Sequence, residues 1–169
     1  MMHPITVANA VDEAFIDYVL NREHSWQRGT VVAGEQEAPS VNRRCWCEDL
    51  SKDGVVQDMC ESLFDLYPDV AVNDQMQITL MKYRAEDVGN FETHQDVNFE
   101  LGKLCRKLSM TILLTDSDQG GELEIMNTKQ KLDVGDAIVF PSYLPHSVKP
   151  VTVGERVSLV AWRLGEHWR

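Results

Sequence analysis

The sequence has few basic residues, no long apolar run and no repeated or low-complexity segment. It holds 16 lysines and arginines against 27 aspartates and glutamates, which gives a formal net charge of −11. An excess of negative charge opposes any binding that depends on neutralising phosphates, so nucleic acid and anionic membranes are disfavoured as partners. No stretch approaches the roughly 20 apolar residues of a membrane-spanning helix, so we expect no membrane partner.

The N-terminus and the cysteines both favour the cytoplasm. The first residues, MMHPITVANAVDEAF, lack the basic and apolar regions of a secretory signal peptide. Four cysteines are present, and Cys45 and Cys47 form a C-x-C pair without a second pair at a zinc-binding spacing. Free thiols in a reducing compartment are the simplest interpretation, and the role of the pair stays open. We therefore expect an intracellular, cytoplasmic protein.

Length and composition are typical of one soluble globular domain over residues 1–169. Hydrophobic residues make up 43% of the chain and charged residues 25%, and a chain of this length can bury a core without disulfides or metals. Helical spacing predicts helices over about 11–21 and 52–67. The segments 26–32 and 42–50 are predicted to be strands.

From Gln75 onward the hydrophobic pattern changes to period two, which predicts a series of short strands. The expected strands are 75–83, 107–115, 121–126, 130–134, 136–140, 146–151 and 156–162. Glycine, proline and asparagine residues typical of turns separate them. Seven or eight such strands indicate a β-sandwich or barrel, with the two N-terminal helices covering one sheet.

The segment NFETHQDVNFE places His94 and Asp96 two residues apart, so on a strand both side chains face the same side. The H-x-D pair alone is a weak signal. Two imidazoles and one carboxylate suit a non-haem Fe(II) that keeps positions open, so a third ligand should be a distant histidine. His146, where a loop enters a strand, is the candidate, although alone it is equally well explained as a satisfied loop histidine. The remaining three histidines, His3, His24 and His167, are better explained as surface residues.

The strand GERVSLVAW carries the next signal. Alternation places Arg156, Ser158, Val160 and Trp162 on one face. A guanidinium and a hydroxyl together can bind a carboxylate, and an arginine inside a barrel is costly unless an anion meets it. Because no acidic residue shares this face, the anion is expected to be a ligand. The alternative is a solvent-facing arginine at the start of a strand.

His94-x-Asp96, His146 and Arg156-x-Ser158 together resemble the Fe(II)- and 2-oxoglutarate-dependent oxygenases, and within them the prolyl 4-hydroxylase type. The similar stretches are GNFETHQD, LLTDSDQGGELEI and VGDAIVFPSYLPHSVKPVTVGERVSLVAW, in matching order and spacing. They cover nearly half of the chain, which makes the resemblance far more specific than any single motif.

The resemblance implies a mainly β fold, a double-stranded β-helix or jelly roll with supporting N-terminal α-helices. The helical support would cover about 1–74 and the catalytic core about 75–165. The metal ligands would be His94, Asp96 and His146. The segment Glu86–Phe91, before the metal pair, is expected to form a mobile flap.

The resemblance also assigns a cosubstrate site. Arg156 would bind the distal carboxylate of 2-oxoglutarate, with help from Ser158 and Tyr83. Together with the three metal ligands, Arg156 makes up the expected catalytic residues. Tyr83 lies eleven residues before the first histidine, where the family expects nine or ten. Leu113 stands where some relatives carry a carboxylate-binding tyrosine, so that contact would be lost or replaced. Trp162 completes the residues assigned to the cosubstrate.

The implied activity is hydroxylation of an unactivated C–H bond, foremost of a prolyl residue in a peptide or protein, with Fe(II), 2-oxoglutarate and O₂. Ascorbate is a candidate reductant. Alternatives are the same chemistry on a free amino acid, a small molecule or a nucleobase, and a non-enzymatic cupin-like metal-binding module. Nucleobase-modifying relatives carry a second arginine six residues after the first, where this chain has Trp162. The cupin-like module gives no reason for Arg156 and Ser158 to share an interior face.

Overall fold

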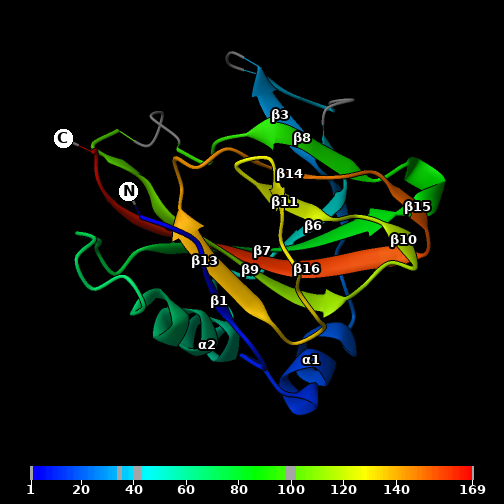
Figure 1. Ribbon diagram of the computed structural model, residues 1–169, viewed down its shortest axis with the longest axis horizontal. Coiled ribbons are helices and arrows are strands. Elements are labelled where there is room, and N and C mark those ends of the chain that lie inside the picture. Colours follow the sequence, from blue (N-terminus) through cyan, green and yellow to red (C-terminus); the bar gives the residue numbers. More distant parts are fainter. Residues whose placement is uncertain (1, 34–35, 40–42, 98–101, 169) are drawn as a thin grey trace.

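The computed structural model of the chain describes residues 2–33, 36–39, 43–97 and 102–168. Two antiparallel sheets form its frame (Figure 1). In spatial order, the seven-stranded sheet contains β1 (Ile5–Val7), β13 (Ala137–Pro141), β9 (Leu104–Thr115), β16 (Glu155–Glu166), β7 (Met76–Arg84), β6 (Trp46–Asp49) and β2 (Gln27–Arg28). The five-stranded sheet contains β12 (Thr128–Lys129), β11 (Leu123–Ile125), β14 (His146–Val148), β8 (Asn90–His94) and β5 (Arg43–Arg44). This two-sheet arrangement confirms the predicted jelly-roll class.

Two short ribbons and three helical segments complete the described chain. The ribbons pair β10 (Gln119–Gly120) with β15 (Val151–Val153), and β3 (Thr30–Ala33) with β4 (Gln36–Pro39). The helical segments are α1 (Glu13–Leu20), α2 (Gly54–Phe64) and the 3₁₀ turn η1 (Ala85–Asp87). Among the described residues, none of these helices combines the length and the apolar character that crossing a bilayer requires.

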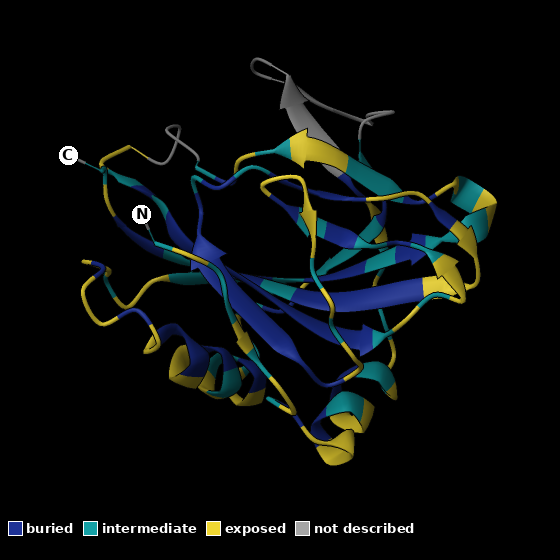
Figure 2. Cartoon of the chain, in the orientation of Figure 1, coloured by how far each residue is buried: buried dark blue, intermediate teal, exposed yellow. Residues whose placement is uncertain are grey.

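Alternation along the long strands builds a core on each face of the seven-stranded sheet. Leu80 and Leu159 point to one face, where they pack with Phe15 of α1 and Val56 of α2. Figures 1 and 2 show the two helices beneath this sheet, with buried residues toward it and exposed residues on their outer sides. The predicted covering of one sheet by two N-terminal helices is therefore confirmed. The opposite face meets the five-stranded sheet, and the candidate site lies between the two sheets.

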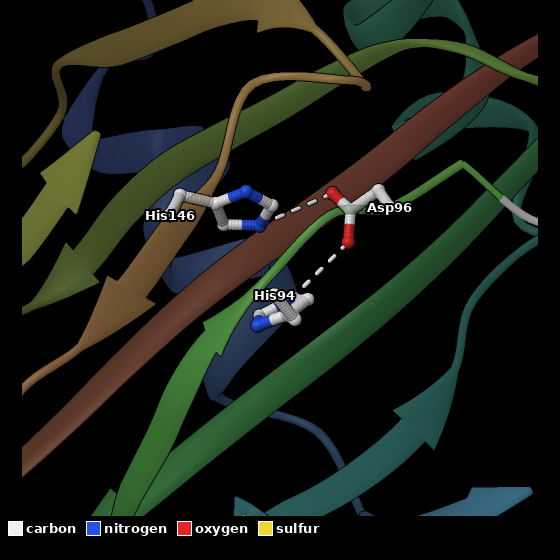
Figure 3. A group of neighbouring side chains, drawn as sticks. All are labelled: His94, Asp96 and His146. Atoms are coloured by element: carbon white, nitrogen blue, oxygen red, sulfur yellow. Dashed lines mark ion pairs between the residues drawn. The ribbon is translucent and has the colours of Figure 1, made fainter. Parts of the chain in front are cut away.

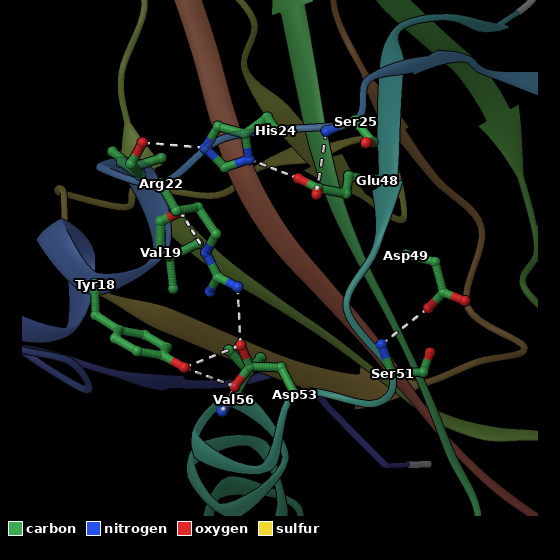
Figure 4. Close-up of polar contacts among 11 residues, drawn as sticks. Tyr18, Val19, Arg22, His24, Ser25, Glu48, Asp49, Ser51, Asp53 and Val56 are labelled. Atoms are coloured by element: carbon green, nitrogen blue, oxygen red, sulfur yellow. Dashed lines mark hydrogen bonds and ion pairs between the residues drawn. The ribbon is translucent and has the colours of Figure 1, made fainter.

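One carboxylate fixes α1 relative to α2 (Figure 4). Asp53 is the N-cap of α2 and accepts a hydrogen bond from the Val56 backbone N–H at 3.1 Å. Its other oxygen accepts from Arg22, just past the end of α1, at 2.9 Å, and the Tyr18 hydroxyl lies 3.1 Å from the same oxygen. Partial burial opposes ionisation of Asp53, but these donors outweigh it and lower the pKa of the carboxyl below its ordinary value. The ionised form of Asp53 therefore stabilises the junction between the helices.

The predicted helices are present with shorter bounds, and one predicted strand is wrong. Residues 130–134 form a loop, and the strand that pairs with β11 is instead Thr128–Lys129. The reason is turn geometry, because Met126 and Asn127 both adopt left-handed conformations with φ of 53° and 59°. Two such residues close a tight hairpin, so the returning strand begins directly after them.

Two further features concern the region before the metal pair. Among the strands that the N-terminal part adds to the main sheets, β2, β5 and β6 lie in segments predicted as strands, whereas β1 was not predicted. Of the predicted strand 42–50, residue 42 lies outside the described residues and the remainder is divided between β5 and β6. At the expected flap, Glu86–Phe91, the chain forms η1 and then enters β8. Asp87 anchors this turn by accepting from Arg84 at 2.7 Å and from the Trp46 indole at 2.9 Å.

Candidate metal and cosubstrate site

Three potential metal ligands meet where β8 and β14 lie side by side (Figure 3). His94 is the last residue of β8, and Asp96 follows two residues later. His146 is the first residue of β14 and is the register partner of His94. The ligand atoms of the three side chains all lie within 4.8 Å of one another. The structure thus brings together the triad that the sequence predicted from segments about fifty residues apart.

The hydrogen bonds of the two imidazoles orient the triad. His94 Nδ1 lies 2.7 Å from the carbonyl oxygen of Glu92, and His146 Nδ1 lies 3.0 Å from that of Leu144. A ring that donates its Nδ1–H to a carbonyl presents the lone pair of Nε2, which is the tautomer that a metal ligand needs. Each Nε2 lies 3.3 Å from a different oxygen of Asp96. Both free imidazole nitrogens therefore converge on the carboxylate.

Asp96 is a buried carboxylate, with 6% of its surface exposed. The Ser109 hydroxyl donates to its Oδ2 at 2.7 Å and lies 2.8 Å from the Ser142 hydroxyl. Burial alone would raise the pKa of Asp96, but the adjacent His146 and His94 hold it well below its ordinary value. Burial likewise opposes the charge on His146, and the Asp96 carboxylate overcomes this and raises the pKa of that histidine. The site therefore stabilises a buried negative charge, and a bound metal ion would take the place of the imidazole proton that faces it.

This donor set fits a divalent non-haem iron. Two imidazoles and one carboxylate bind one side of the metal and leave other positions open for further ligands. Neighbouring aromatic rings limit the movement of both histidines: Phe91 stacks on His94 with ring centroids 3.7 Å apart, and Phe140 meets His146 edge-on at 4.9 Å. Fe(II) would bind to His94, Asp96 and His146.

β16 presents its polar side chains to the same cavity. Arg156, Ser158, Val160 and Trp162 line it together with the triad, so the predicted common face is present. Arg156 is 3% exposed and donates from Nη1 to the Ser158 hydroxyl at 3.0 Å. Arg156 takes part in none of the ion pairs formed among the described residues. Burial lowers its pKa, although the nearby Tyr83 and Asp116 partly oppose this. A buried guanidinium without an ion-pair partner requires an anion.

The other predicted cosubstrate residues divide between two cavities. Tyr83 is buried and borders the triad cavity; its ring centroid lies 6.0 Å from the Arg156 guanidinium, and its hydroxyl contacts the Met81 sulfur at 3.5 Å. Burial raises the pKa of Tyr83, so it is a neutral donor. Trp162 also lines the triad cavity. Leu113 does not: it borders a neighbouring polar cavity of about 300 Å³, of which Arg156 forms part of the wall.

Three residues at this site were not predicted. Ser109 and Thr111 face the triad side of β9, and the alternation in KLSMTILLT could have indicated both. Arg106, whose guanidinium lies 3.8 Å from the centre of the Trp162 ring, could not be found in this way. A register shift between Arg106 and Leu108 of β9 interrupts the alternation at this point. Strand irregularities of this kind change the direction of side chains without a clear sequence signal.

A model of the 2OG-Fe(II) oxygenase superfamily matches residues 77–163, slightly more than half of the chain. The chain belongs to this superfamily. The matched segment contains the three candidate ligands and every residue predicted to bind the cosubstrate. The cofactors of the superfamily, Fe(II) and 2-oxoglutarate, agree with the donor set of the triad and with the buried guanidinium of Arg156.

Individual relatives make the likeness more specific. A PKHD-type hydroxylase of Alteromonas mediterranea is 44% identical over 61 residues, which are 32% of this chain and 27% of that protein. A PKHD-type hydroxylase of Variovorax paradoxus is 27% identical over 81% of this chain and 66% of the relative. The chain thus spans less than two thirds of these relatives. A prolyl hydroxylase of Trichoplax adhaerens, solved with a peptide fragment of the hypoxia inducible factor oxygen degradation domain, has a TM-score of 0.71. It shares 16% identity over 95% of this chain and 82% of its own, and so shows the common fold.

Proposed function

We propose that this chain is an Fe(II)- and 2-oxoglutarate-dependent hydroxylase that acts on a prolyl residue in a peptide or protein. The observation that carries the proposal is the shared cavity between the two sheets. One wall holds a His–Asp–His triad with both imidazoles oriented by backbone carbonyls. Another wall holds a buried arginine without an ion-pair partner among the described residues. A metal-binding module alone would not require that arginine.

The chain's residues divide the work of binding and orientation. His94, Asp96 and His146 hold the metal, and the Ser109 hydroxyl fixes the carboxylate. When bound, Fe(II) with 2-oxoglutarate and O₂ supplies the oxidising power for C–H hydroxylation, coupled to release of succinate and CO₂. Arg156 binds the distal carboxylate of the cosubstrate, because a guanidinium offers paired donors in a geometry that matches a carboxylate.

Ser158 and Tyr83 complete the cosubstrate site. The Ser158 hydroxyl already accepts from Arg156 and therefore orients the guanidinium. Tyr83 is a neutral phenol whose hydroxyl contacts a weak sulfur acceptor, and it can turn toward a carboxylate. Leu113 lines the adjoining polar cavity together with Arg156 and offers it an apolar side chain in place of a hydrogen-bonding one.

The opposite end of the cavity supports a peptide substrate. Trp162 is 5% exposed, and its indole N–H has no hydrogen-bond partner among the described residues. Arg106 stacks on that indole and is oriented by a 2.8 Å bond from its Nε to the Gln77 side chain. The indole N–H and the guanidinium beside it are hydrogen-bond donors of the kind that a peptide carbonyl oxygen accepts from. The names of the hydroxylase relatives and the peptide-bound Trichoplax enzyme point in the same direction.

The test is succinate formation with Fe(II), 2-oxoglutarate and O₂, with and without ascorbate. We expect proline-containing peptides to stimulate succinate release and to gain one oxygen atom by mass. A matched peptide with alanine in place of proline should not respond, nor should free proline or an oligonucleotide. Stimulation by free proline or by the oligonucleotide alone would overturn the peptide assignment. Failure to form succinate under any condition, in protein that binds Mn²⁺ and 2-oxoglutarate, would overturn the hydroxylase assignment.

A further inference from the structure

Two cysteines meet where the chain crosses from one sheet to the other. Arg43 and Arg44 form β5, which pairs with β8, and Trp46 begins β6, which pairs with β7 of the other sheet. Cys45 lies between these strands and is 1% exposed, and Cys47 is partly exposed. Their sulfur atoms are 3.5 Å apart. Two thiols in direct contact therefore occupy the joint between the sheet that carries His94 and the sheet that carries Tyr83.

Arg43 connects this cysteine pair to the metal site. Its Nη2 donates to the Cys47 sulfur at 3.4 Å. Its guanidinium carbon lies 4.9 Å from the centre of the Phe91 ring, and Phe91 is also its register partner in β8. Phe91 in turn stacks on His94 with ring centroids 3.7 Å apart. A change at the sulfur atoms can therefore reach a metal ligand through two side-chain contacts.

The two thiols also differ from a buried structural cysteine in their chemistry. A hydrogen bond from the Cys47 thiol, together with the Arg43 guanidinium, lowers the pKa of Cys45 below its ordinary value in spite of burial. A lowered pKa increases the thiolate fraction, and the thiolate is the nucleophile in thiol oxidation. By contrast, burial raises the pKa of Cys60 to about 12, so that thiol stays protonated. The four cysteines are therefore not equally reactive.

We propose that Cys45 and Cys47 form a redox-sensitive site in which hydrogen peroxide converts the two thiols to a disulfide and thereby weakens the metal site. The Cys45 thiolate attacks one peroxide oxygen, which breaks the O–O bond, forms a sulfenic acid and releases one water after protonation. The Cys47 sulfur then attacks the sulfenic sulfur and releases a second water. Two thiols lose two electrons and two protons, and one peroxide is reduced to two waters.

Close packing around the cysteine pair transmits its movement to Arg43. A Cβ atom at Gly29 would lie 2.7 Å from the Cys45 sulfur and 3.2 Å from Arg43 Nε, so no free space separates these three residues. The Gly29 N–H donates to the Cys45 carbonyl at 2.8 Å and holds its backbone. Closure of the bond shortens the 3.5 Å distance between the sulfur atoms to about 2 Å and therefore displaces the sulfur acceptor of Arg43. A disulfide is also a weaker acceptor than a thiolate, so the contact that holds Arg43 over the Phe91 ring is weakened.

The first test measures the bond itself and does not depend on hydroxylase activity. The full chain is treated with hydrogen peroxide, its free thiols are alkylated, and it is digested with trypsin. Cleavage after Arg44 and Lys52 places both cysteines on one peptide, CWCEDLSK. We expect this peptide to carry no alkyl group and to be two hydrogens lighter than its dithiol form. After reduction with dithiothreitol and a second alkylation, it should carry two alkyl groups. A peptide that stays doubly labelled, or that carries a sulfinic acid without the disulfide, would overturn the proposal.

The second test asks whether oxidation reaches the metal site. After removal of peroxide, Mn²⁺ is titrated into the protein. We expect Mn²⁺ to bind about three- to tenfold more weakly to the oxidised form, as the loss of an aromatic contact predicts, and dithiothreitol to restore the affinity. Dithiothreitol does not reduce methionine sulfoxide, so any loss of Mn²⁺ affinity that comes from methionine oxidation will persist after this treatment. The Cys47→Ser variant should keep its affinity after peroxide, and the control Cys60→Ala should respond as the wild type does. Equal affinity in the two wild-type forms, or equal loss in Cys47→Ser, would overturn the link to the metal.

Discussion

Removal of the Arg156 side chain tests whether the buried guanidinium binds the cosubstrate. Arg156 is 3% exposed and donates a hydrogen bond to the Ser158 hydroxyl at 3.0 Å. A bidentate pair with the distal carboxylate of 2-oxoglutarate would add two charge-assisted hydrogen bonds, each worth roughly 1.5–3 kcal/mol. Loss of even one of them corresponds to about a tenfold change in affinity. We therefore expect Arg156→Ala to weaken 2-oxoglutarate binding by at least about tenfold.

The affinities of the conservative variants for 2-oxoglutarate should follow the interactions that each variant retains. Arg156→Lys keeps the charge but loses the planar pair of donors, so its affinity should lie between those of the wild type and the alanine variant. Ser158→Ala and Tyr83→Phe each remove one neutral hydrogen-bonding group, which is worth about 1 kcal/mol, and should cost less. Mn²⁺ affinity measured without cosubstrate should stay close to that of the wild type in all four variants, because none of these groups belongs to the triad.

The assay is calorimetric titration with 2-oxoglutarate under anaerobic conditions, with Mn²⁺ in place of iron. Arg163→Ala is the matched control, because Arg163 lies on the same strand but pairs with Glu61 of α2, 3.4 Å away on the opposite face. The control should bind 2-oxoglutarate as the wild type does. If Arg156→Ala also binds with unchanged affinity, the guanidinium has no part in cosubstrate binding. The reasoning from its burial would then be refuted, and a metal-binding module would explain the site better.

The remaining predictions concern the metal site and the helix junction. Alanine at His94, Asp96 or His146 should abolish both Mn²⁺ binding and turnover, and unchanged binding in any variant would exclude that residue as a ligand. Ser109→Ala should weaken Mn²⁺ binding about 10–100-fold by releasing the Asp96 carboxylate, which a titration will measure; a wild-type affinity would contradict this orienting role. Asp53→Ala should lower the free energy of unfolding in urea by about 1–2 kcal/mol through loss of the N-cap. Folding lowers the pKa of Asp53, so the loss of unfolding free energy in Asp53→Ala should be largest above the ordinary carboxyl pKa. It should shrink as the pH falls through the pKa that Asp53 has in the folded protein. A loss of stability that does not change with pH would contradict the contribution of the ionised carboxylate.

Much of the architecture was predictable because local patterns and the tertiary fold agree. Period-two alternation marked the long strands β7, β9 and β16, whose buried residues point to a core on each side. The same alternation placed Arg156 and Trp162 on one face. Helical spacing located α1 and α2, although Asp12 and Asp53 set their starts as N-caps, one or two residues from the predicted bounds. The resemblance to a known family added the His146 assignment, which the residues alone had left open.

The sequence by itself thus determined the class of the fold, the alternation of its strands and the H-x-D pair, since each depends on neighbours along the chain. Only the tertiary structure decided which residues surround the metal pair. Alternation gives the side on which Ser109 lies but not its contact with Asp96, which depends on the packing of β9 beside the segment after β8. Arg106 stacks on Trp162 because β9 and β16 pair with a register shift that no local pattern reveals. The contact between Cys45 and Cys47 likewise depends on the chain crossing between sheets at that point. Pairing partners and strand irregularities are set by the total packing of both sheets, and therefore they are not encoded in any single segment.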